Sequence, residues 1–498
     1  MVLSAIIITT CFIISILLII TNKVNRAIAV LSGAVITYLV LTFVEGRNVT
    51  IFIDFLFGTP TDGFVNLRAI ILIIGVLFIV QICQSAGVFQ VGAFKLIQLT
   101  KGNSTYLLLV FCLLSVLLSA ILNNILSVIV LIPLTVVSSR ILGIDPSPYI
   151  LCEAILVNIG AILFPISSIP NILITTYATI SFLEFFVNVG LFAFFLFAIT
   201  FVYFYLKYKD KLMIPKERAK DVLKDFNVWN YVPDKKLFYK AALTLLIVMI
   251  CFLIVPSTIL PLDMIAFMGG LFLLIISKLN AKEIYSKIDL ELILYLFGIF
   301  IITGGMESVG VLNLIGAGLI FLTGSNSLIV ILTILWFSAF LSSTIDNIPI
   351  TQVLIPVIDV MTLKLPSNHV KTAFYSLAYG ANLGDNLTPL GDNVIVMNIA
   401  EQNERPISFS EFLKLGFTAT IIQLCAISLY YTLMMETYLG LIILSFVLLI
   451  ISLFFLRRYL KRKNINVKLK INEFIKKLRL KIRIKRPKKT IIEKLEGI

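Results

Sequence analysis

Two stretches of the chain place amide and carboxylate side chains in the middle of apolar runs. Residues 343–351 read STIDNIPIT, and residues 119–127 read SAILNNILS. Asp346 and Asn347, like Asn123 and Asn124, carry the hard oxygen ligands that Na⁺ accepts. A charged side chain at the centre of a membrane helix costs about 2.5 to 3.5 kcal/mol on insertion scales, so Asp346 must face the protein interior. We therefore predict that Asp346 binds an ion or exchanges a proton.

The two stretches belong to an internal repeat. Residues 118–133 align without gaps on residues 341–356, at an offset of 223, and 8 of 16 positions are identical. Residues 158–171 (NIGAILFPISSIPN) then match residues 382–393 (NLGDNLTPLGDN) through their shared Asn, Gly and Pro. Each half of the chain is thus predicted to repeat one module of apolar spans with two polar breaks.

Breaks of this kind are suited to binding ions. Irregular backbone in hydrocarbon is tolerated only where it is buried in protein or lines a watery cavity. Asp346 and Asn347 could cap a new helix with Pro349 in its first turn. Freed carbonyls would bind a cation, and the N–H groups at a helix start would attract an anion. Four related breaks therefore predict one central site at the interface of the repeats.

The candidate ligands come from all four breaks. The second copy has Asp385 and Asp392 where the first has Ala161 and Ser168, so we expect an asymmetric site. Capping and hydrogen bonding between helices are the alternative roles for these side chains. The predicted substrate- and ion-binding residues are Asn123, Asn124, Asn158, Ser167, Asn171, Asp346, Asn347, Thr351, Asn382, Asp385, Thr388 and Asp392. A Na⁺ ion is predicted at Asn124, Asn347 and Asp346, and further carboxylates to consider are Glu153, Glu291 and Glu307.

The composition defines the elements that must position these residues. Of 498 residues, 59% are hydrophobic and 14% are charged, whereas a soluble chain has about 45–50% and 25%. Many runs approach the roughly 20 apolar residues that cross a bilayer. We predict an all-α polytopic membrane protein with about 10–13 transmembrane helices in two repeats with broken helices.

The domain boundaries follow from the polar stretches. Residues 207–240 form the longest polar stretch inside the hydrophobic body and divide it near its middle. The predicted organisation is an N-terminal helix and basic turn (1–26), a first repeat of scaffold and transport module (27–206), a cytoplasmic linker (207–240), a second repeat (241–435), a last transmembrane helix (436–456) and a basic tail (457–498).

The net charge of +14 lies in the tail, where residues 457–498 hold 17 Lys and Arg and 3 Glu. Basic flanks stay on the cytoplasmic side, so we expect a multi-pass protein of the cell membrane with a cytoplasmic tail. The tail could also contact anionic lipid. It has one aromatic residue, Phe474, and no stacking pattern, so no nucleic-acid partner is expected.

Other classes of function lack their signatures. The six cysteines lie in apolar runs without a Cys/His cluster, and His369 is the one histidine, so no cofactor is expected beyond Na⁺ or H⁺ as coupling ion. No G-x-x-x-x-G-K-[ST] motif occurs, which argues against an ATPase within this chain. We expect a transporter and no enzyme; an intramembrane enzyme using Asp385 and Asp392 is the alternative from another class, and a channel is a third.

The pieces LSAILNNILSVIVLIPL, NIGAILFPISSIPNILI, LSSTIDNIPITQVLIPVI and GANLGDNLTPLGDN together resemble the ion transporter superfamily. That superfamily includes arsenical pump membrane subunits, D-type sodium/proton antiporters, and citrate and dicarboxylate transporters. The resemblance spans roughly residues 27–435 and implies secondary transport of a small ion coupled to Na⁺ or H⁺ by alternating access. It also implies that the two repeats are inverted and contain re-entrant hairpins.

The resemblance also implies the substrate and the partners. We expect an inorganic or carboxylate anion, moved by arsenite-like efflux or by anion transport, with Na⁺/H⁺ antiport as the alternative. The partners implied are the small ion, the lipid bilayer, a second copy in a homodimer, and a separate ATPase subunit of the kind that arsenical subunits can pair with.

Overall fold

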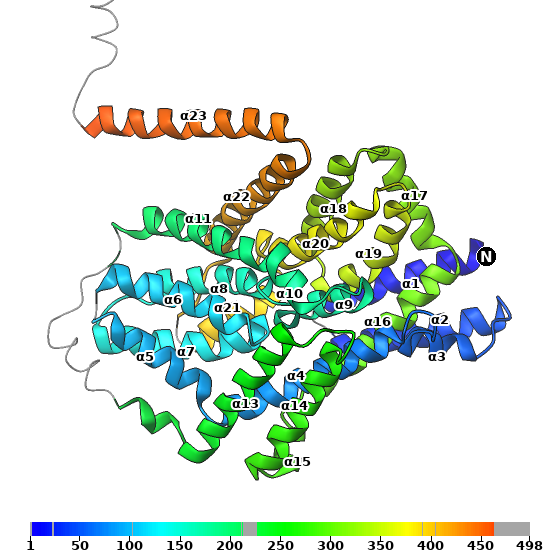
Figure 1. Cartoon of the computed structure of the whole chain (residues 1–498), viewed down its shortest axis with the longest axis horizontal. Coiled ribbons are helices and arrows are strands. Elements are labelled where there is room, and N and C mark those ends of the chain that lie inside the picture. Colours follow the sequence, from blue (N-terminus) through cyan, green and yellow to red (C-terminus); the bar gives the residue numbers. More distant parts are fainter. Residues whose placement is uncertain are drawn as a thin grey trace, which may run out of the picture. The chain divides into compact units, whose positions relative to one another are not determined.

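The computed structural model describes residues 2–21, 24–101, 103–210, 212, 227–390, 392–403 and 405–462. Regular secondary structure in these ranges is helical, without strands (Figure 1). Two compact units, residues 1–428 and 429–498, make up the chain, and the features below lie in the first. The predictions for the tail beyond residue 462 and for residues 213–226 of the linker lie outside the described residues.

The helices of the first half are α1 (Val2–Ile20), α2 (Arg26–Phe43), α3 (Thr50–Phe57), α4 (Val65–Ser85), α5 (Val88–Leu99), α6 (Ser104–Ser119), α7 (Asn124–Leu142), α8 (Ser147–Ala161), η1 (Pro165–Ser167), α9 (Ile169–Tyr177), α10 (Phe182–Phe185), η2 (Phe186–Gly190) and α11 (Leu191–Tyr208).

Those of the second half are η3 (Val228–Tyr231), α13 (Lys235–Ile254), α14 (Leu262–Ser277), α15 (Ala281–Tyr285), α16 (Leu290–Ser308), α17 (Val311–Thr323), α18 (Ser327–Ser342), α19 (Asn347–Thr362), α20 (Ser367–Gly384), η4 (Asp385–Leu387), α21 (Asp392–Gln402), α22 (Phe409–Met435) and α23 (Thr437–Arg462).

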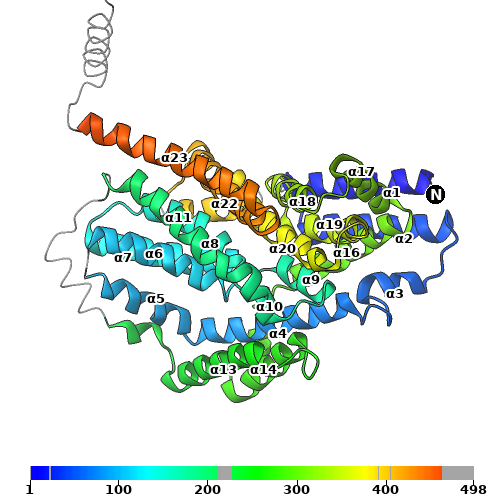
Figure 2. The ribbon, with the colours of Figure 1, turned by 45° about the horizontal axis from the view of Figure 1, so that its top comes forward.

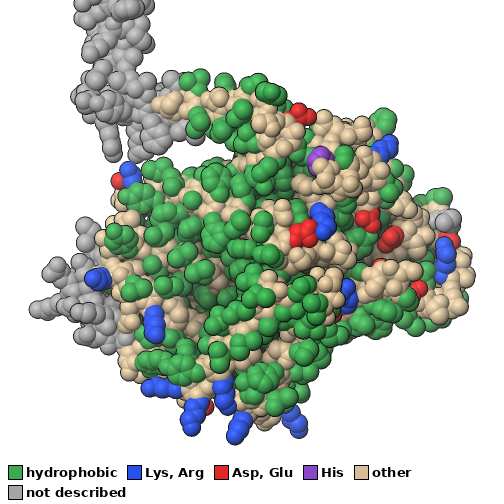
Figure 3. All heavy atoms as spheres, viewed as in Figure 1, with side chains coloured by type: hydrophobic (Ala, Val, Ile, Leu, Met, Phe, Trp, Pro, Cys, Tyr) green, Lys and Arg blue, Asp and Glu red, His purple; other side chains and the backbone are tan. Residues whose placement is uncertain are grey.

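The helices have the lengths and surfaces of a membrane protein. In the described part of the chain, 8 helices of 18 or more residues are apolar enough to cross a membrane, and shorter apolar helices such as α6, α8 and α19 accompany them. Hydrophobic side chains cover much of the face seen in Figure 3, and Lys and Arg side chains gather along its lower edge. The all-helical, polytopic fold predicted from the sequence is confirmed.

The two halves have the same order of helices. A long helix (α4 or α16) is followed by a short one (α5 or α17), a broken pair (α6–α7 or α18–α19), and a buried helix (α8 or α20). A 3-10 turn (η1 or η4) and another short helix (α9 or α21) then lead into the last long segment. The repeat read from the sequence is therefore a repeat of structure.

Helices of each half also pack against helices of the other half. Helix α14 of the second half packs along α4 of the first, and α2 packs along α16 (Figures 1 and 2). Helix α9 packs on α19, and α21 packs on α7. Because each half covers apolar faces of the other, neither is a separate packing unit.

Two equivalent glycines allow a close helix contact in each repeat. Helix α8 packs on α6 at Gly160, and α20 packs on α18 at Gly384. A Cβ on Gly160 would clash with the carbonyl oxygen of Val116, and one on Gly384 would clash with that of Ala339. Small residues of this kind let membrane helices approach closely, which brings α8 and α20 against the broken helices.

Candidate functional site

The two predicted helix breaks are present at equivalent positions. Helix α6 ends at Ser119 and α7 begins at Asn124, while α18 ends at Ser342 and α19 begins at Asn347. Asn123 caps α7, its Oδ1 accepting from the Leu126 N–H at 2.8 Å, and Asp346 caps α19, its Oδ1 accepting from the Ile348 N–H at 3.0 Å. The alignment at offset 223 thus locates both breaks and both caps.

The same side-chain contact holds each break in place. Ser119 Oγ donates to the carbonyl of Val157 at 2.6 Å, and Ser342 Oγ donates to the carbonyl of Ala381 at 2.6 Å. Each bond joins the last turn of the first half-helix to the neighbouring buried helix. The last turn of α6 is therefore hydrogen-bonded to α8, and the last turn of α18 is hydrogen-bonded to α20.

Both breaks open onto one small cavity of about 50 Å³. Asn123 and Asn124 line it from the first repeat, and Asp346 and Asn347 line it from the second. Within the described part of the chain, no hydrogen bond engages the side-chain amide of Asn347, which is 6% exposed. The start of α7 and the start of α19, two carboxylates, one guanidinium and three amides thus border a space of the size of one or two water molecules, at about 30 Å³ each.

A chain of amides connects the cavity to the interior. Asn124 Nδ2 donates to Asn158 Oδ1, Asn158 Nδ2 donates to Asn386 Oδ1 at 2.7 Å, and Asn386 Nδ2 donates to the Ile155 carbonyl at 2.8 Å. A second pair, Asn382 Nδ2 to Asn171 Oδ1 at 2.8 Å, also joins the two repeats. Asn124 is half-buried and the other four asparagines are buried. The predicted residues Asn158, Asn171 and Asn382 therefore lie at the repeat interface.

Hydrogen bonds connect the loops after α8 and α20 to the two helix breaks. Ser167 Oγ donates to the Ala120 carbonyl at 2.6 Å, and Thr388 Oγ1 donates to the Ser343 carbonyl. Within these loops, Asn171 Nδ2 donates to the Ala161 and Phe164 carbonyls at 2.7 and 3.2 Å. Asn393 Nδ2 donates to those of Asp385 and Thr388 at 2.7 and 3.2 Å. Ser167 and Thr388 thus hold the loops against the breaks.

Of the twelve predicted residues, four line the central cavity, namely Asn123, Asn124, Asp346 and Asn347. Its lining does not include Asn158, Ser167, Asn171, Asn382, Thr351, Thr388 or Asp385. Thr351 is buried and its hydroxyl donates to the Asn347 carbonyl at 2.7 Å, and Thr388 faces a separate hollow beside Phe417. Asp385 is buried at the start of η4. Helix α21 begins at Asp392, but the side chain of Asp392 lies outside what the structure describes.

Four side chains that the sequence did not single out belong to the site, namely Arg26, Asp289, Tyr295 and Asn386. Tyr295 OH donates to Asp346 Oδ2 at 3.3 Å. The Arg26 guanidinium lies 5.7 Å from the centre of the Tyr295 ring, pairs with Asp289 and Glu291 at 3.2 Å each, and lines the cavity together with Asp289. Asn386 stood within the quoted NLGDNLTP motif, whereas Arg26 and Tyr295 carry no signal in the sequence because α2 and α16 meet only in the folded chain.

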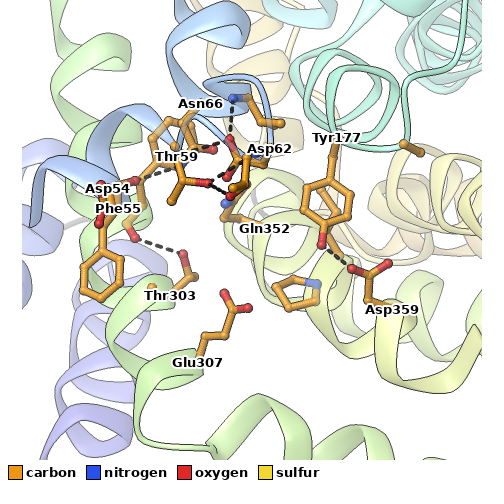
Figure 4. A pocket seen from close by; sticks show the side chains of 18 of the residues that line it. Asp54, Phe55, Thr59, Asp62, Asn66, Tyr177, Thr303, Glu307, Gln352 and Asp359 are labelled. Carbon is orange, nitrogen blue, oxygen red and sulfur yellow. Dashed lines mark hydrogen bonds between the residues drawn. The ribbon is translucent and has the colours of Figure 1, made fainter. Parts of the chain in front are cut away.

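A larger cavity of about 1040 Å³, which we call the vestibule, lies along the same helices α16 and α19 (Figure 4). Its wall includes Thr303 and Gln352, and Tyr177 OH donates to Asp359 Oδ2. Its charged lining residues are Asp54, Asp62, Glu307, Asp359 and Lys371. Four of these five residues are acidic, and among the described residues no three His, Cys, Asp or Glu form a metal-binding group.

The chain was compared with known protein families and proteins. The family model described as "Citrate transporter" (CitMHS) matches residues 16–361 and 255–465. The 46 kDa membrane protein of Mycobacterium leprae is 28% identical over 424 residues, covering 84% of this chain and 96% of that protein. An uncharacterized transporter of Mycobacterium tuberculosis is 26% identical over 425 residues, with the same coverage of 84% and 96%.

More distant relatives are also similar. The human P protein is 24% identical over 505 residues, covering 85% of this chain and 59% of the P protein. Among solved structures, the YdaH transporter of Alcanivorax borkumensis matches with a TM-score of 0.49 at 12% identity, covering 74% of this chain and 85% of that one.

Proposed function

Because the chain belongs to the citrate transporter family, we propose that it is a secondary active transporter that moves a small carboxylate anion, of the class that includes citrate, together with Na⁺ or H⁺. Anion and coupling ion bind where the two broken helices meet. The transporter alternates between conformations that open this site to one side of the membrane at a time.

One observation carries the proposal: the N-termini of α7 and α19 and the carboxylate of Asp346 border the same cavity. Helix N-termini favour negative charge. A carboxylate beside them favours a cation, and it would repel an anion that arrived alone. A site with both features is suited to taking an anion and a cation together, which is the requirement of coupled transport.

The size of the cavity supports a cycle in which the cation fits the conformation described here and the anion enters in another. At about 50 Å³ it holds a cation and a water, and it is too small for a tricarboxylate. The anion would therefore enter in a conformation in which the breaks have moved apart. A site that changes volume with conformation is expected of alternating access and not of a static pore.

The experiment is uptake into proteoliposomes that contain the purified protein. Labelled citrate is supplied under an inward Na⁺ gradient, an inward H⁺ gradient, both, or neither, and counterflow is measured with unlabelled citrate inside. We expect saturable uptake that one of the cation gradients drives, with counterflow. Uptake that does not saturate, or unitary currents in planar bilayers, would show a channel and contradict the proposal.

The vestibule favours a second candidate function, Na⁺/H⁺ antiport. Four of its five charged lining residues are acidic, and a cavity of that sign attracts cations and repels anions. The same proteoliposomes, loaded with a fluorescent pH dye, test this reading without citrate. Dissipation of a preset pH gradient on addition of Na⁺ alone would establish antiport, whereas dissipation only when the anion is also present would establish coupled anion transport.

A further inference from the structure

A buried carboxyl group that the cavity does not use lies in the first repeat. Glu153 is on α8 and is 1% exposed, on a helix whose residues Pro148 to Ala161 are all buried. Its Oε1 accepts a hydrogen bond from Thr135 Oγ1 of α7. Its Oε2 is buried and, among the described residues, has no partner.

No positive charge neutralises this carboxyl in the described part of the chain. The Lys207 amino group lies over the rings of Tyr203 and Tyr208, 5.8 and 5.9 Å from their centres. Tyr379 of α20 donates to the Val189 carbonyl at 3.0 Å. The titratable residues on α8 and on the elements packed against it are Tyr106 and Cys112 of α6, Arg140 of α7, Tyr149 and Cys152 of α8, Tyr203, Tyr205, Lys207 and Tyr208 of α11, His369, Lys371, Tyr375 and Tyr379 of α20, Asp385 of η4, and Asp392 and Glu401 of α21.

A carboxylate buried with one hydrogen bond and no counter-ion is costly, by several kcal/mol per ion even after relaxation. Binding a proton removes that cost, because a neutral carboxyl needs only ordinary hydrogen bonds. Thr135 already satisfies one oxygen. The second oxygen, Oε2, can carry the proton. The burial of Glu153 in this structure therefore favours its protonated form.

The second repeat has no counterpart of this pair. At the offsets of 223 and 224 that relate the repeats, Thr135 corresponds to Ile358 and Glu153 corresponds to Leu377. Both of these apolar residues are buried, at 1% and 0% exposed. The contact between α19 and α20 thus has no carboxyl group at the two positions equivalent to Thr135 and Glu153. Packing alone does not require Glu153 in the α7–α8 pair.

Other buried hydroxyls, one turn from Thr135 or from Glu153, also have no partner among the residues that the structure describes. Ser138 and Ser139 lie one turn beyond Thr135 on α7, and Tyr149 lies one turn before Glu153 on α8. These positions lead toward the connection between α7 and α8, where Gly143 and Asp145 are exposed. They provide hydroxyl groups between the buried carboxyl and water, through which a proton can be exchanged when the helices separate.

We propose that Glu153 is a proton-binding site of the transport cycle, which takes up a proton before the helices close and releases it to water in the open conformation. The inference rests on the transport function proposed above and specifies H⁺ as a co-transported ion. The proton bonds to Oε2 on uptake, and that O–H bond breaks on release, with water as donor and acceptor. Asp346 remains the cation ligand of the central cavity.

The test compares wild-type protein with Glu153→Gln and with Glu283→Gln, which makes the same change at an exposed residue of α15. We expect wild type and Glu283→Gln to show H⁺-driven citrate uptake. In Glu153→Gln, uptake should lose its dependence on the H⁺ gradient while counterflow continues. Infrared spectra of wild type at neutral pH should show a protonated carboxyl band that Glu153→Gln removes.

Each outcome decides one of the two proposals. Absence of counterflow in wild type overturns the transport function, and the infrared band then tests Glu153 alone. Unchanged H⁺-driven uptake in Glu153→Gln, or a carboxyl spectrum identical to that of wild type, overturns the role of Glu153. If Glu153→Gln does not fold, Thr135→Val should shift the band through loss of its hydrogen bond, and an unmoved band overturns the assignment.

Discussion

Asn124 and Asn347 each begin the second half of a broken helix, and both line the same cavity although 223 residues separate them. Asn124 donates to Asn158, whereas the amide of Asn347 is not engaged by any described residue. Asn124 thus belongs to the hydrogen-bonded framework of the site, whereas the proposed ion ligand is its equivalent, Asn347.

Asp346→Asn should abolish coupling without unfolding the protein. Asn caps helices as well as Asp does, so α19 keeps its start, but the cavity loses the carboxylate of Asp346 and keeps only that of Asp289, which pairs with Arg26. We expect counterflow to weaken and gradient-driven citrate uptake to disappear in proteoliposomes. Asp234→Asn is the matched control, since Asp234 also caps a helix by accepting from the residue two positions on, at 2.8 Å. Wild-type coupling in Asp346→Asn would remove Asp346 from the mechanism.

Asn158→Ala should lower both stability and transport. The truncation leaves the Asn124 amide donor and the Asn386 carbonyl oxygen without their partner. Each unsatisfied buried group costs about 1–3 kcal/mol, which a lower midpoint of thermal unfolding in detergent would report. Asn188→Ala removes only one exposed bond, to the Glu184 carbonyl at 2.7 Å, and should change little. Equal midpoints for the two variants would contradict the amide chain.

Gly384→Ala and Gly160→Ala should each destabilise the fold, by about 1–3 kcal/mol as expected for overpacking. Their new methyl groups would meet the backbone of α18 and α6. Gly92→Ala and Gly318→Ala serve as controls, because a Cβ there meets nothing within 4 Å. On helices these two changes should stabilise by about 0.5–1 kcal/mol. The midpoint of thermal unfolding is measured for the four variants. Equal shifts of the midpoint in all four would contradict the close contacts at Gly160 and Gly384.

The vestibule should raise the local concentration of cations. Replacing two of its acids, as Asp54→Asn with Glu307→Gln, should raise the concentration of coupling cation needed for half-maximal uptake at low salt. The effect should fade near physiological ionic strength, where the screening length is about 8 Å. Uptake assays across a salt series measure it, with Glu283→Gln as the control for an exposed acid elsewhere. An effect independent of salt would point to direct binding.

Much of the fold was predictable because it depends on local chemistry. Apolar runs predict helices in a membrane, and Asn123 or Asp346 after an apolar helix predicts a break and a cap. Asn123 and Asp346, which align at the offset of 223, each cap the helix that follows, as the hydrogen bonds from the Leu126 and Ile348 N–H groups show. The association of Asn124 with Asn347 follows from the same symmetry.

The roles of individual side chains were less predictable. Thr351 and Thr388 looked like ligands, yet their hydroxyls donate to backbone carbonyls. A hydroxyl near a helix break can serve either purpose, and the distance to the nearest carbonyl decides which. That distance depends on how neighbouring helices pack.

The sequence by itself determined the membrane class, the repeat and the positions of both helix breaks, since these depend on hydropathy, capping and internal similarity. The folded chain was needed to show that Tyr295 contacts both Arg26 and Asp346, and that Glu153 is buried without a counter-ion among the described residues. Contacts between α2 and α16, or between α7 and α8, join faces of helices whose rotation and partners are set by packing over the whole chain.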